Sequence, residues 1–415
     1  MDINAGATAW VLISAGLVLF MTPGLAFFYA GMVRSKNVLG MLMQNVFAMG
    51  LISILWVFVG FSLAFGGTNR YIGNFDFAFL RGVVGDVTKA ADLPGYAGTL
   101  VVPGLAFMAF QMMFAVITPA LISGATADRL KFGSYAVFIG LWSVLVYSPV
   151  AHWVFSPTGW LFRRGALDFA GGSAIHINAG IAALVLTMVL GPRRGWMKEA
   201  MPPHNLPYTV LGMGILWFGW FGFNAGSALT ADGLPAQALV NTHLAAAAAM
   251  LTWLLVERLM AKHATTLGAA SGAVAGLVAI TPCAGYVNSM SAVAIGAIAG
   301  IVCFLCLKLK FALKLDDSLD VIAVHLVGGL LGSLLLGFFG DKSATGFGTD
   351  GVFFGGGWGL LADQAVAAAA VIVFSGVVTW IIAFGIDKTI GLRVSVEDEL
   401  VGLDQSQHAE AAYQS

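Results

Sequence analysis

Two histidines, each eight residues after an aspartate, are the side chains best placed by the sequence to do chemistry. His176 follows Asp168 within an apolar segment, and His325 follows Asp317 in the same way far downstream. Eight helical residues span about 12 Å, so each imidazole is expected near the middle of an apolar layer roughly 30 Å thick. Ionisable groups are costly at that depth, and histidine titrates near neutral pH, so the matched pair is a candidate for proton transfer. The alternative is that both are core histidines that bond to backbone groups.

The composition indicates that these histidines lie in an integral membrane protein. The chain has 415 residues, of which 59% are hydrophobic and 10% charged, whereas a soluble domain carries about 25% charged residues. The 53 glycines suit close packing of helices in lipid, and a net charge of -1 gives no indication of nucleic-acid binding. The three cysteines lie in apolar segments without a second CxxC pair, so we expect no metal site and no cofactor. The signatures of nucleotide-driven coupling and of hydrolysis are absent from the sequence, which argues against an enzyme.

Eleven apolar segments are long enough to cross a bilayer. They run at roughly 8–31, 38–66, 100–124, 132–154, 171–191, 206–228, 235–256, 266–282, 288–309, 320–340 and 360–386. The first segment is too long for a signal peptide and lacks a basic start, so we expect it to be retained. The predicted fold is therefore an all-α integral membrane protein, with a transmembrane domain over 1–386 and a polar, acidic tail over 387–415.

The positions of Lys and Arg predict how the chain is oriented. Most of the 20 Lys and Arg residues fall in connectors on one side of the segments, together with the tail. The positive-inside rule assigns that side to the cytoplasm. We therefore expect a multi-pass protein of the cytoplasmic membrane with its N-terminus outside and its C-terminus inside, as an odd number of spans requires.

The two Asp–His spacings also predict an inverted repeat. The fifth segment runs inward from Asp168, whereas the tenth runs outward from Asp317. Five spans followed by five of opposite sense is the arrangement of many transporters. We expect repeats at about 8–191 and 206–340, followed by a final helix, with His176 and His325 reaching the same depth from opposite faces.

Aromatic side chains and one serine could complete a path for a small cation. Phe110 and Phe223 lie in apolar segments, where the usual role of aromatic rings is packing or an interfacial belt. The alternative is a stack of rings that closes a narrow path. Ser227 is predicted near the outer surface, where a hydroxyl and ring faces can hold a small cation. Asp168 precedes a helix start, which indicates a structural capping role.

The motifs around these residues resemble those of the ammonium transporter family (Amt/Mep/Rh), and the bacterial Amt branch most closely. The resemblance covers nearly the whole chain. It rests on these stretches in order: Met21-Thr22-Pro23-Gly24, Gly165-Ala166-Leu167-Asp168-Phe169-Ala170-Gly171-Gly172, His176-Ile177-Asn178-Ala179, Pro203-His204-Asn205-Leu206-Pro207, Gly219-Trp220-Phe221-Gly222-Phe223-Asn224-Ala225-Gly226-Ser227, Asp316-Asp317 with Asp320 and His325, and Gly391-Leu392-Arg393-Val394. The resemblance implies eleven spans, a five-plus-five inverted repeat, and a homotrimer with one pore per subunit.

The resemblance also implies roles for single residues. His176 and His325 match the family's twin histidines, which relay protons, and Phe110 and Phe223 match its two-phenylalanine gate. Ser227 matches the outer binding serine, with Phe110 beside it, and Asp168 matches a structural acid. The positions that match the apolar pore lining are Leu25, Leu121, Val154, Leu216 and Val321. Where the Amt branch has a tryptophan after Ala-His-x-Val, this chain has Phe155, so that either Phe155 or Trp160 could form the outer cation site.

The function implied is transport of ammonium or ammonia across the cytoplasmic membrane. The cation would be recruited outside, and ammonia would pass Phe110 and Phe223 through an apolar pore in which the twin histidines relay the proton. Whether the proton travels with the ammonia is left open by the sequence. Two alternatives are an ammonium sensor whose transport is incidental and a neutral gas channel of the Rh type, against which Ser227 argues. The implied partner is a cytoplasmic PII-type regulatory protein.

Overall fold

The computed structural model describes residues 2–83, 89–96 and 99–413. Throughout this part of the chain the regular structure is helical, apart from the isolated bridges Asp2–Lys89 and Leu130–Arg393. Ten helical segments are long and apolar enough to cross a membrane, and Thr266–Ile280 is a shorter apolar helix between two of them. The prediction of an all-α protein with eleven apolar segments is therefore confirmed.

The segments are built from regular helices and, in five places, from wider turns of the π type. In chain order they comprise α1 (Ala5–Met32); α2 (Val38–Leu55), η2 (Trp56–Gly60) and α3 (Phe61–Phe65); α4 (Gly104–Thr126); α5 (Phe132–Trp142), η4 (Ser143–Tyr147) and α6 (Ser148–Phe155); η5 (Gly172–Ile177) and α8 (Asn178–Leu190); α9 (Leu206–Trp220) and η6 (Phe221–Ala225); α10 (Gly233–Ala261); α11 (Thr266–Ile280); α12 (Ser289–Cys306); η7 (Ile322–Val327) and α14 (Gly328–Phe339); and α16 (Gly359–Thr389). Shorter elements in the connectors are η1 (Ser35–Asn37), η3 (Ala78–Leu80), α7 (Trp160–Arg164), α13 (Leu309–Ala312), α15 (Lys342–Thr345) and η8 (Val352–Phe354). The wide turns are not apparent from the apolar pattern of the sequence.

Polar side chains fix where several of these helices begin. The side chains of Asn4, Asp232, Thr265 and Asn288 each accept a hydrogen bond from a backbone N–H in the first turn that follows. Such caps satisfy amide groups that have no partner within the helix. These four helices consequently begin at a defined polar residue rather than fraying into the connector.

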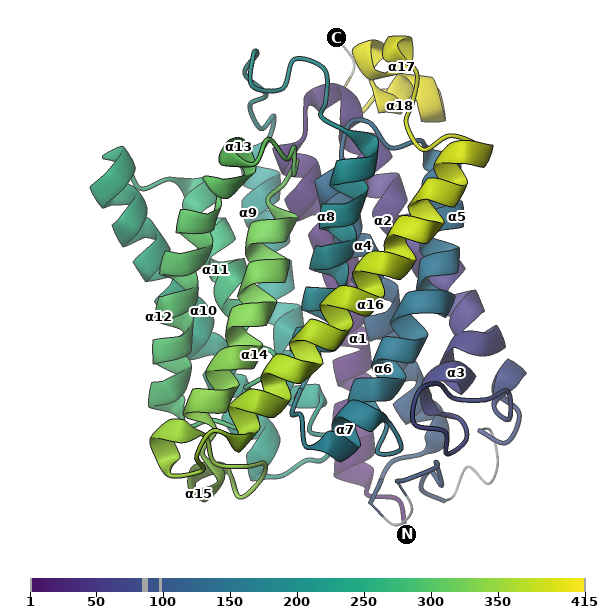
Figure 1. The fold of residues 1–415 in the computed structure, drawn as a ribbon, viewed down its shortest axis with the longest axis vertical. Coiled ribbons are helices and arrows are strands. Elements are labelled where there is room, and N and C mark those ends of the chain that lie inside the picture. Colours follow the sequence, from purple (N-terminus) through teal and green to yellow (C-terminus); the bar gives the residue numbers. More distant parts are fainter. Residues whose placement is uncertain (1, 84–88, 97–98, 414–415) are drawn as a thin grey trace.

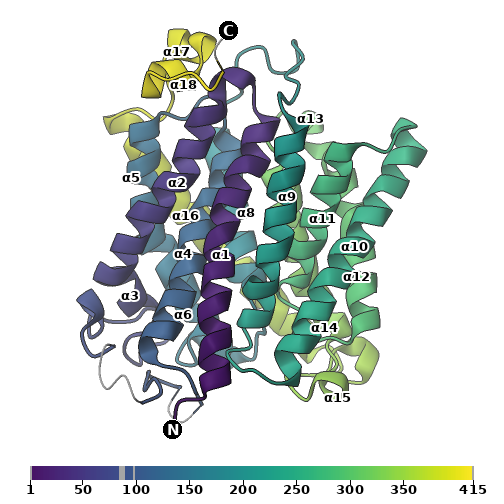
Figure 2. The same ribbon diagram turned by 180° about the vertical axis from the view of Figure 1, so that it is seen from behind.

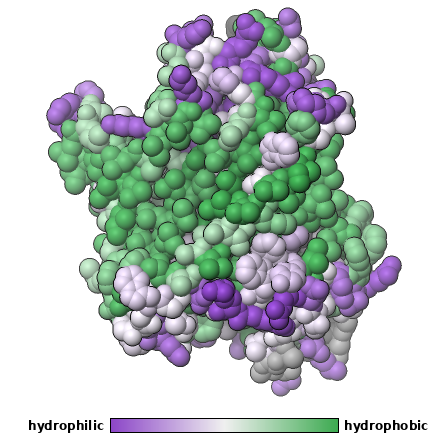
Figure 3. Space-filling view, viewed as in Figure 1, coloured by the Kyte–Doolittle hydropathy of each residue, from purple (hydrophilic) through white to green (hydrophobic). Residues whose placement is uncertain are grey.

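The helices form one bundle with an apolar middle and two polar ends. The two termini lie at opposite ends, and α16 runs diagonally across the outside of α14, α8 and α5 (Figure 1). Seen from behind, α1 and α9 pack side by side along the length of the bundle (Figure 2). The space-filling view shows a broad apolar belt between two polar ends (Figure 3). A multi-pass membrane protein follows from this belt.

Of the polar tail predicted at 387–415, residues 387–389 complete α16 and the described remainder, 390–413, folds back onto the bundle. Its helices α17 (Val396–Val401) and α18 (Leu403–His408) lie over the end of the bundle at which α16 finishes. Asp404 accepts a hydrogen bond of 2.8 Å from the Gly40 amide at the start of α2, and the Leu403 amide donates to Asn37 Oδ1 at 2.8 Å. The tail is therefore packed against the connector between the first two segments.

Candidate functional site

The structure brings His176 and His325 into contact inside the bundle. Their Nδ1 atoms lie 3.3 Å apart, and the two rings are 5.3 Å apart at an angle of 25°. Both side chains are almost fully buried. Since two imidazoles can share a hydrogen bond only when one nitrogen donates and the other accepts, the pair holds a single proton between these two atoms. The Nε2 atom of His176 is buried and has no hydrogen-bond partner among the described residues.

Two aspartates position the turns that carry the histidines. Asp168 accepts hydrogen bonds from the amides of Gly171, Gly172, Ser173 and Ala174 at 2.6–3.1 Å, and from the Ser173 hydroxyl at 2.5 Å. A carboxylate at the start of a helix satisfies free amides and interacts favourably with the positive end of its dipole. The capping role predicted for this carboxylate matches these contacts.

Asp317 repeats the arrangement at the start of the tenth segment. It accepts hydrogen bonds from the amides of Val321 and Ile322 at 3.1 and 2.7 Å. Each histidine then lies in a wide turn, η5 or η7, which packs against the regular helix of the opposite repeat, α14 or α8. This reciprocal packing corresponds to the predicted inverted relation of the two segments.

A glycine four residues after each histidine allows the two turns to approach one another. A Cβ atom on Gly180 would lie 2.4 Å from the backbone nitrogen of Leu326, and one on Gly329 would lie 2.9 Å from the Cβ of His176. Neither position has room for a side chain, because real Cβ atoms are not found so close to other heavy atoms. The contact between the histidines thus depends on close backbone packing on both sides.

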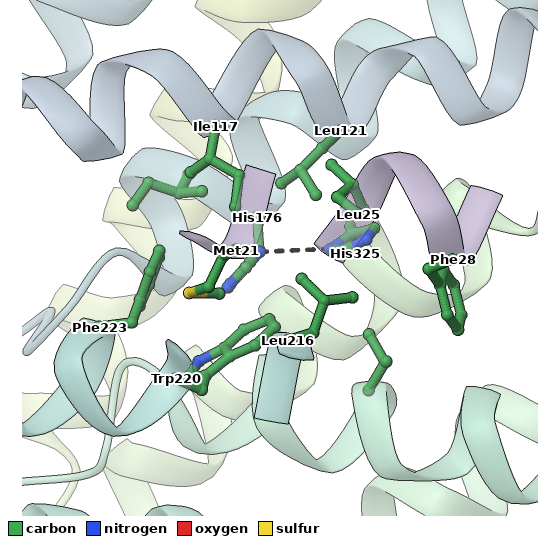
Figure 4. Close-up of a pocket in the computed structure, with 12 residues that line it drawn as sticks. Met21, Leu25, Phe28, Ile117, Leu121, His176, Leu216, Trp220, Phe223 and His325 are labelled. Atoms are coloured by element: carbon green, nitrogen blue, oxygen red, sulfur yellow. Dashed lines mark hydrogen bonds between the residues drawn. The ribbon is translucent and has the colours of Figure 1, made fainter. Parts of the chain in front are cut away.

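The histidines line a narrow apolar cavity. It is bounded by Met21, Leu25, Phe28, Ile117, Leu121, Ile175, His176, Leu216, Trp220, Phe223, Val274 and His325. In Figure 4, Phe223 and Phe28 lie at opposite ends of the row of residues, and the paired imidazoles lie between them. Among the described residues that line the cavity, side-chain nitrogen atoms belong to the two histidines and to Trp220 alone. The lining suits a small neutral molecule far better than a hydrated ion.

Three of the five positions predicted to line a pore border this cavity: Leu25, Leu121 and Leu216. The other two do not. Val154 packs in a separate apolar cluster with Trp153 and Leu161, and Val321 lies against Gly124 next to the start of the tenth segment.

The ring of Phe114 lies between those of Phe110 and Phe223, the two residues predicted to form a gate, and contacts both. The centroids of Phe114 and Phe223 are 4.4 Å apart, whereas Phe110 meets Phe114 edge-on at 4.8 Å. Phe110 and Phe114 are one helical turn apart on the same face of α4. The sequence alone therefore does not decide which of the two rings meets Phe223. The ring of Phe223 lies in turn 6.0 Å from that of His176. A continuous aromatic stack therefore leads to the histidine pair.

Ser227 lies just beyond this stack. Its hydroxyl donates to the Phe223 carbonyl at 2.8 Å and its side chain is half-buried. The neighbouring Gly226 packs so closely on the Phe110 ring that a Cβ there would lie 2.9 Å from the ring edge. The predicted grouping of Ser227 with Phe110 is thus compatible with the geometry.

The two aromatic residues that could complete the outer site, Phe155 and Trp160, share one neighbouring apolar cluster. Phe155 packs against the main core that holds Phe110, Phe114 and Phe223, and its carbonyl accepts a hydrogen bond of 2.7 Å from the Tyr96 hydroxyl. Trp160 packs in the cluster of Val154, with its ring 5.7 Å from that of Trp153. Phe155 borders the cluster of Val154 as well, so the outer cation site remains a prediction for either ring.

Trp220 and Phe28 are cavity residues that the sequence reading did not single out. The Trp220 ring stacks on His176 at 5.5 Å, and its indole N–H donates to the Thr281 hydroxyl at 2.9 Å. Trp220 directly precedes the Phe221–Ser227 run. Its position beside this glycine- and aromatic-rich stretch could have marked it as a cavity residue. Phe28 closes the far end of the cavity, and nothing in its sequence neighbourhood distinguishes it from a packing residue.

A buried charge network lies at the end of the bundle that the tail covers. The Arg129 guanidinium donates to the carbonyls of Gly191 and Asp316 and to the Ser318 hydroxyl, at 2.7–2.9 Å. Burial lowers the pKa of Arg129 to about 10, and the Asp316 carboxylate opposes this effect. Burial alone would raise the pKa of Asp316, but the hydrogen bonds and charge of Arg193 hold it below its usual value. Both groups are therefore charged at neutral pH and tie three connectors together.

No group of three or more His, Cys, Asp or Glu side chains within the described residues is arranged to hold a metal ion. The groups that remain for chemistry are the two histidines and the aromatic path that leads to them.

The whole chain is similar in sequence and in fold to proteins of one membrane family. Residues 9–413 match the Ammonium Transporter Family. An ammonium transporter of Mycobacterium tuberculosis is 52% identical over 99% of this chain and 90% of its own length. Candida albicans Mep2 has a crystal structure that aligns with a TM-score of 0.88 at 33% identity, over 96% of this chain and 88% of that one. A structure described as a sensor Amt protein aligns with a TM-score of 0.86 at 31% identity, over 98% of each chain.

Proposed function

This chain belongs to the ammonium transporter family, and from that premise we propose that it recruits the ammonium ion at Ser227 and conducts ammonia past paired histidines that relay the proton. The family consists of membrane transporters rather than enzymes. The observation that carries the proposal is the contact of 3.3 Å between the Nδ1 atoms of His176 and His325 inside an apolar cavity.

Recruitment requires a site that favours the cation. The Ser227 hydroxyl can accept a hydrogen bond from ammonium, and the faces of Phe110 and Phe155 can attract its charge. Such ring faces hold a cation most strongly where water is partly excluded, and Ser227 is half-buried. The first step in the proposal is therefore loss of water from the ion beside these groups.

The next step is separation of the proton from ammonia. A charged ammonium ion is costly in the apolar cavity, whereas neutral ammonia is not. The Nε2 atom of His176 has no hydrogen-bond partner among the described residues and can accept a proton, and its ring lies 6.0 Å from that of Phe223. The Nδ1–Nδ1 contact then offers a route onward to His325, and repulsion between two imidazolium ions limits the pair to one additional proton.

The experiment that tests the proposed function is transport by the purified protein in liposomes. An ammonium pulse should evoke a current on a solid-supported membrane, and an equal potassium pulse should not. An ammonium pulse that evokes neither current nor uptake would rule out transport by the chain.

The outer aromatic site gives a separate prediction. Replacing Phe155 with Trp should tighten the apparent affinity for ammonium about two- to fivefold, because Trp is the stronger cation–π partner by roughly 0.5–1 kcal/mol. Concentration series of ammonium-evoked currents measure this affinity. Trp160→Ala is the matched control and should leave it unchanged. If Trp160→Ala abolishes ammonium binding and Phe155→Ala leaves the apparent affinity unchanged, the site belongs to Trp160 instead.

We further propose that residues 1–386 form the transport unit of a homotrimer in the cytoplasmic membrane, with the N-terminus outside. Residues 387–415 then lie in the cytoplasm, where a PII-type regulatory protein could dock. The contacts between the tail and the inner connectors support this role. Glu399 accepts hydrogen bonds from Arg393 and from the Arg194 amide, at 2.7 Å each.

Deletion of 395–415 should consequently reduce both ammonium flux and co-purification of the regulator, since it removes the partners of Arg194 and of the α2 N-terminus. A point variant, Asp404→Ala, should reproduce part of the loss of flux because it uncaps Gly40. Glu410→Ala, on the exposed end of the tail, is the control. Unchanged flux and co-purification after the deletion would exclude a regulatory tail.

An ammonium sensor is the second candidate, favoured by the packed tail and by the likeness to a sensor Amt structure. A sensor without transport would show no ammonium flux in liposomes, yet its tail would change protease sensitivity when ammonium is added.

A further inference from the structure

The last long helix, α16, lies outside the two predicted repeats, yet one of its side chains reaches both segments that carry the histidines. The helix starts beside α14, at the end of the bundle opposite the tail, and crosses α8 on its way to the other end (Figure 1). Gln364 lies in its second turn and is only 2% exposed. A buried primary amide needs partners for its oxygen and for its two N–H groups. Gln364 has these partners at the start of the fifth segment and within the tenth.

The side-chain amide of Gln364 pairs with the backbone of Leu167. The Leu167 N–H donates to Oε1 at 2.7 Å, and Nε2 donates to the Leu167 carbonyl at 2.8 Å. The opposite orientation of the amide would set donor against donor and acceptor against acceptor, so the two bonds together fix the side chain. Leu167 directly precedes Asp168, whose carboxylate caps the turn that carries His176. The backbone that leads into the capping carboxylate is therefore held from α16.

The same amide also holds the segment of the second histidine. Nε2 of Gln364 donates to the Ser333 carbonyl at 3.2 Å. Ser333 lies on α14 one helical turn after Gly329, the glycine that packs against His176. The wide turn η7, which carries His325, continues directly into α14. One buried side chain thus bridges the entry to the first histidine turn and the helix that follows the second.

The other end of the bundle has an equivalent contact. Asp316 directly precedes the capping residue Asp317, and the buried Arg129 donates from Nη2 to the Asp316 carbonyl at 2.7 Å. At both ends, a buried side chain from a different segment holds the carbonyl of the residue before the capping aspartate. Gln364 is the counterpart of Arg129 in this respect, but it carries no charge. The repetition indicates that each histidine turn is fixed at its start from outside its own helix.

We propose that Gln364 is a positioning residue for the histidine pair: by holding Leu167 and Ser333 it keeps the Nδ1 atoms of His176 and His325 in contact. These atoms are 3.3 Å apart, close to the upper limit for a hydrogen bond. A displacement of either turn by a few tenths of an ångström would therefore break the contact. The inference rests on the proposed function, because it assigns Gln364 a role in that proton relay.

Replacing Gln364 with Met tests the role in transport, because Met fills a similar volume without the amide. The maximal ammonium-evoked current should fall at least about tenfold, since misplacing reacting groups by about 1 Å can cost about 100-fold in rate. The ammonium concentration that gives half the maximal current should stay the same, because Ser227 lies apart from this contact. Thr379→Val is the matched control and should leave the current unchanged. It removes a buried hydrogen bond of 3.0 Å from the same helix, between Thr379 and the Trp142 indole.

A Gln364→Glu variant gives a readout that depends on pH and not only on packing. A protonated glutamic acid can accept from the Leu167 N–H and donate to the Leu167 carbonyl, as the amide does. An ionised carboxylate only accepts, so it would face the carbonyls of Leu167 and Ser333 without a proton between them. The current, relative to the unmodified protein at each pH, should therefore fall between about pH 5 and about pH 9. A ratio that is constant over this range would count against the amide pair.

Histidine-selective ¹⁵N nuclear magnetic resonance of the full-length protein tests the positioning itself. The signals of His176 and His325 should shift in Gln364→Met, whereas those of the other histidines should not. A normal current in Gln364→Met, or a reduced current with both signals unshifted, would overturn the inference. The spectra do not require transport. Absence of ammonium current in the unmodified protein would therefore refute the proposed function while the spectra still test the role of Gln364.

Discussion

The current evoked by an ammonium pulse should fall about 100-fold in the His176→Ala variant. A positioned proton acceptor typically contributes at least this factor to a transfer step, and alanine removes the Nε2 atom that is free to accept the proton. His325→Ala should have a similar effect, since it removes the partner of the Nδ1–Nδ1 contact. Solid-supported-membrane recordings on matched liposomes measure both.

A histidine outside the cavity is the control for this prediction. His243 lies against the rings of Trp217 and Phe221 and is exposed, so His243→Ala should leave the current unchanged. Replacing His176 with Glu should retain part of the transport but admit potassium, because a fixed negative charge favours any small cation. Full selectivity in His176→Glu would show that the neutral imidazole is not what excludes potassium.

Removal of either ring of the Phe114–Phe223 stack should cause the second large effect. Phe114→Ala and Phe223→Ala should each raise potassium current by more than about tenfold, because the apolar barrier to a hydrated ion is worth several kcal/mol. Phe110→Ala should instead weaken apparent ammonium affinity while potassium remains excluded, since Phe110 lies beside Gly226 and Ser227 rather than against Phe223.

Phe107→Ala is the matched control for the stack. It is a buried phenylalanine on the same helix, and its ring packs against Phe65 and Tyr96, away from Phe223. Truncation of a buried phenylalanine costs about 3–5 kcal/mol of stability, so all these variants are compared only after thermal unfolding shows that they remain folded. If Phe107→Ala leaks potassium as much as Phe223→Ala does, the leak reports loosened packing and not a gate.

The sequence predicted the architecture and the central pair because both follow from strong physical constraints. Apolar segments of spanning length must be helical in lipid, where backbone groups need internal partners. Equal spacings from Asp168 to His176 and from Asp317 to His325 place the imidazoles at equal depth if the segments run in opposite senses. The glycine four residues after each histidine was visible as well, but its role is clear only once Gly180 meets Leu326.

Other details could not be read from the sequence, since they depend on turns that its apolar pattern does not show. The wide turns η5, η6 and η7 shift the register of side chains relative to a regular helix. Phe110 and Phe114 share a face of α4, so only the position of η6 determines which ring meets Phe223. Val154, which the resemblance assigns to the pore lining, packs in a cluster with Trp153 and Leu161.

The most direct test of the proposed relay is the ammonium-evoked current of the His176→Ala/His325→Ala double variant, recorded beside a potassium pulse on the same membranes. The variant must first give the same elution profile and unfolding temperature as the unmodified protein. If paired imidazoles carry the proton, the ammonium current disappears while potassium remains excluded by the apolar cavity. An ammonium current of unmodified size without potassium leak would contradict the relay and leave His176 and His325 as packing residues.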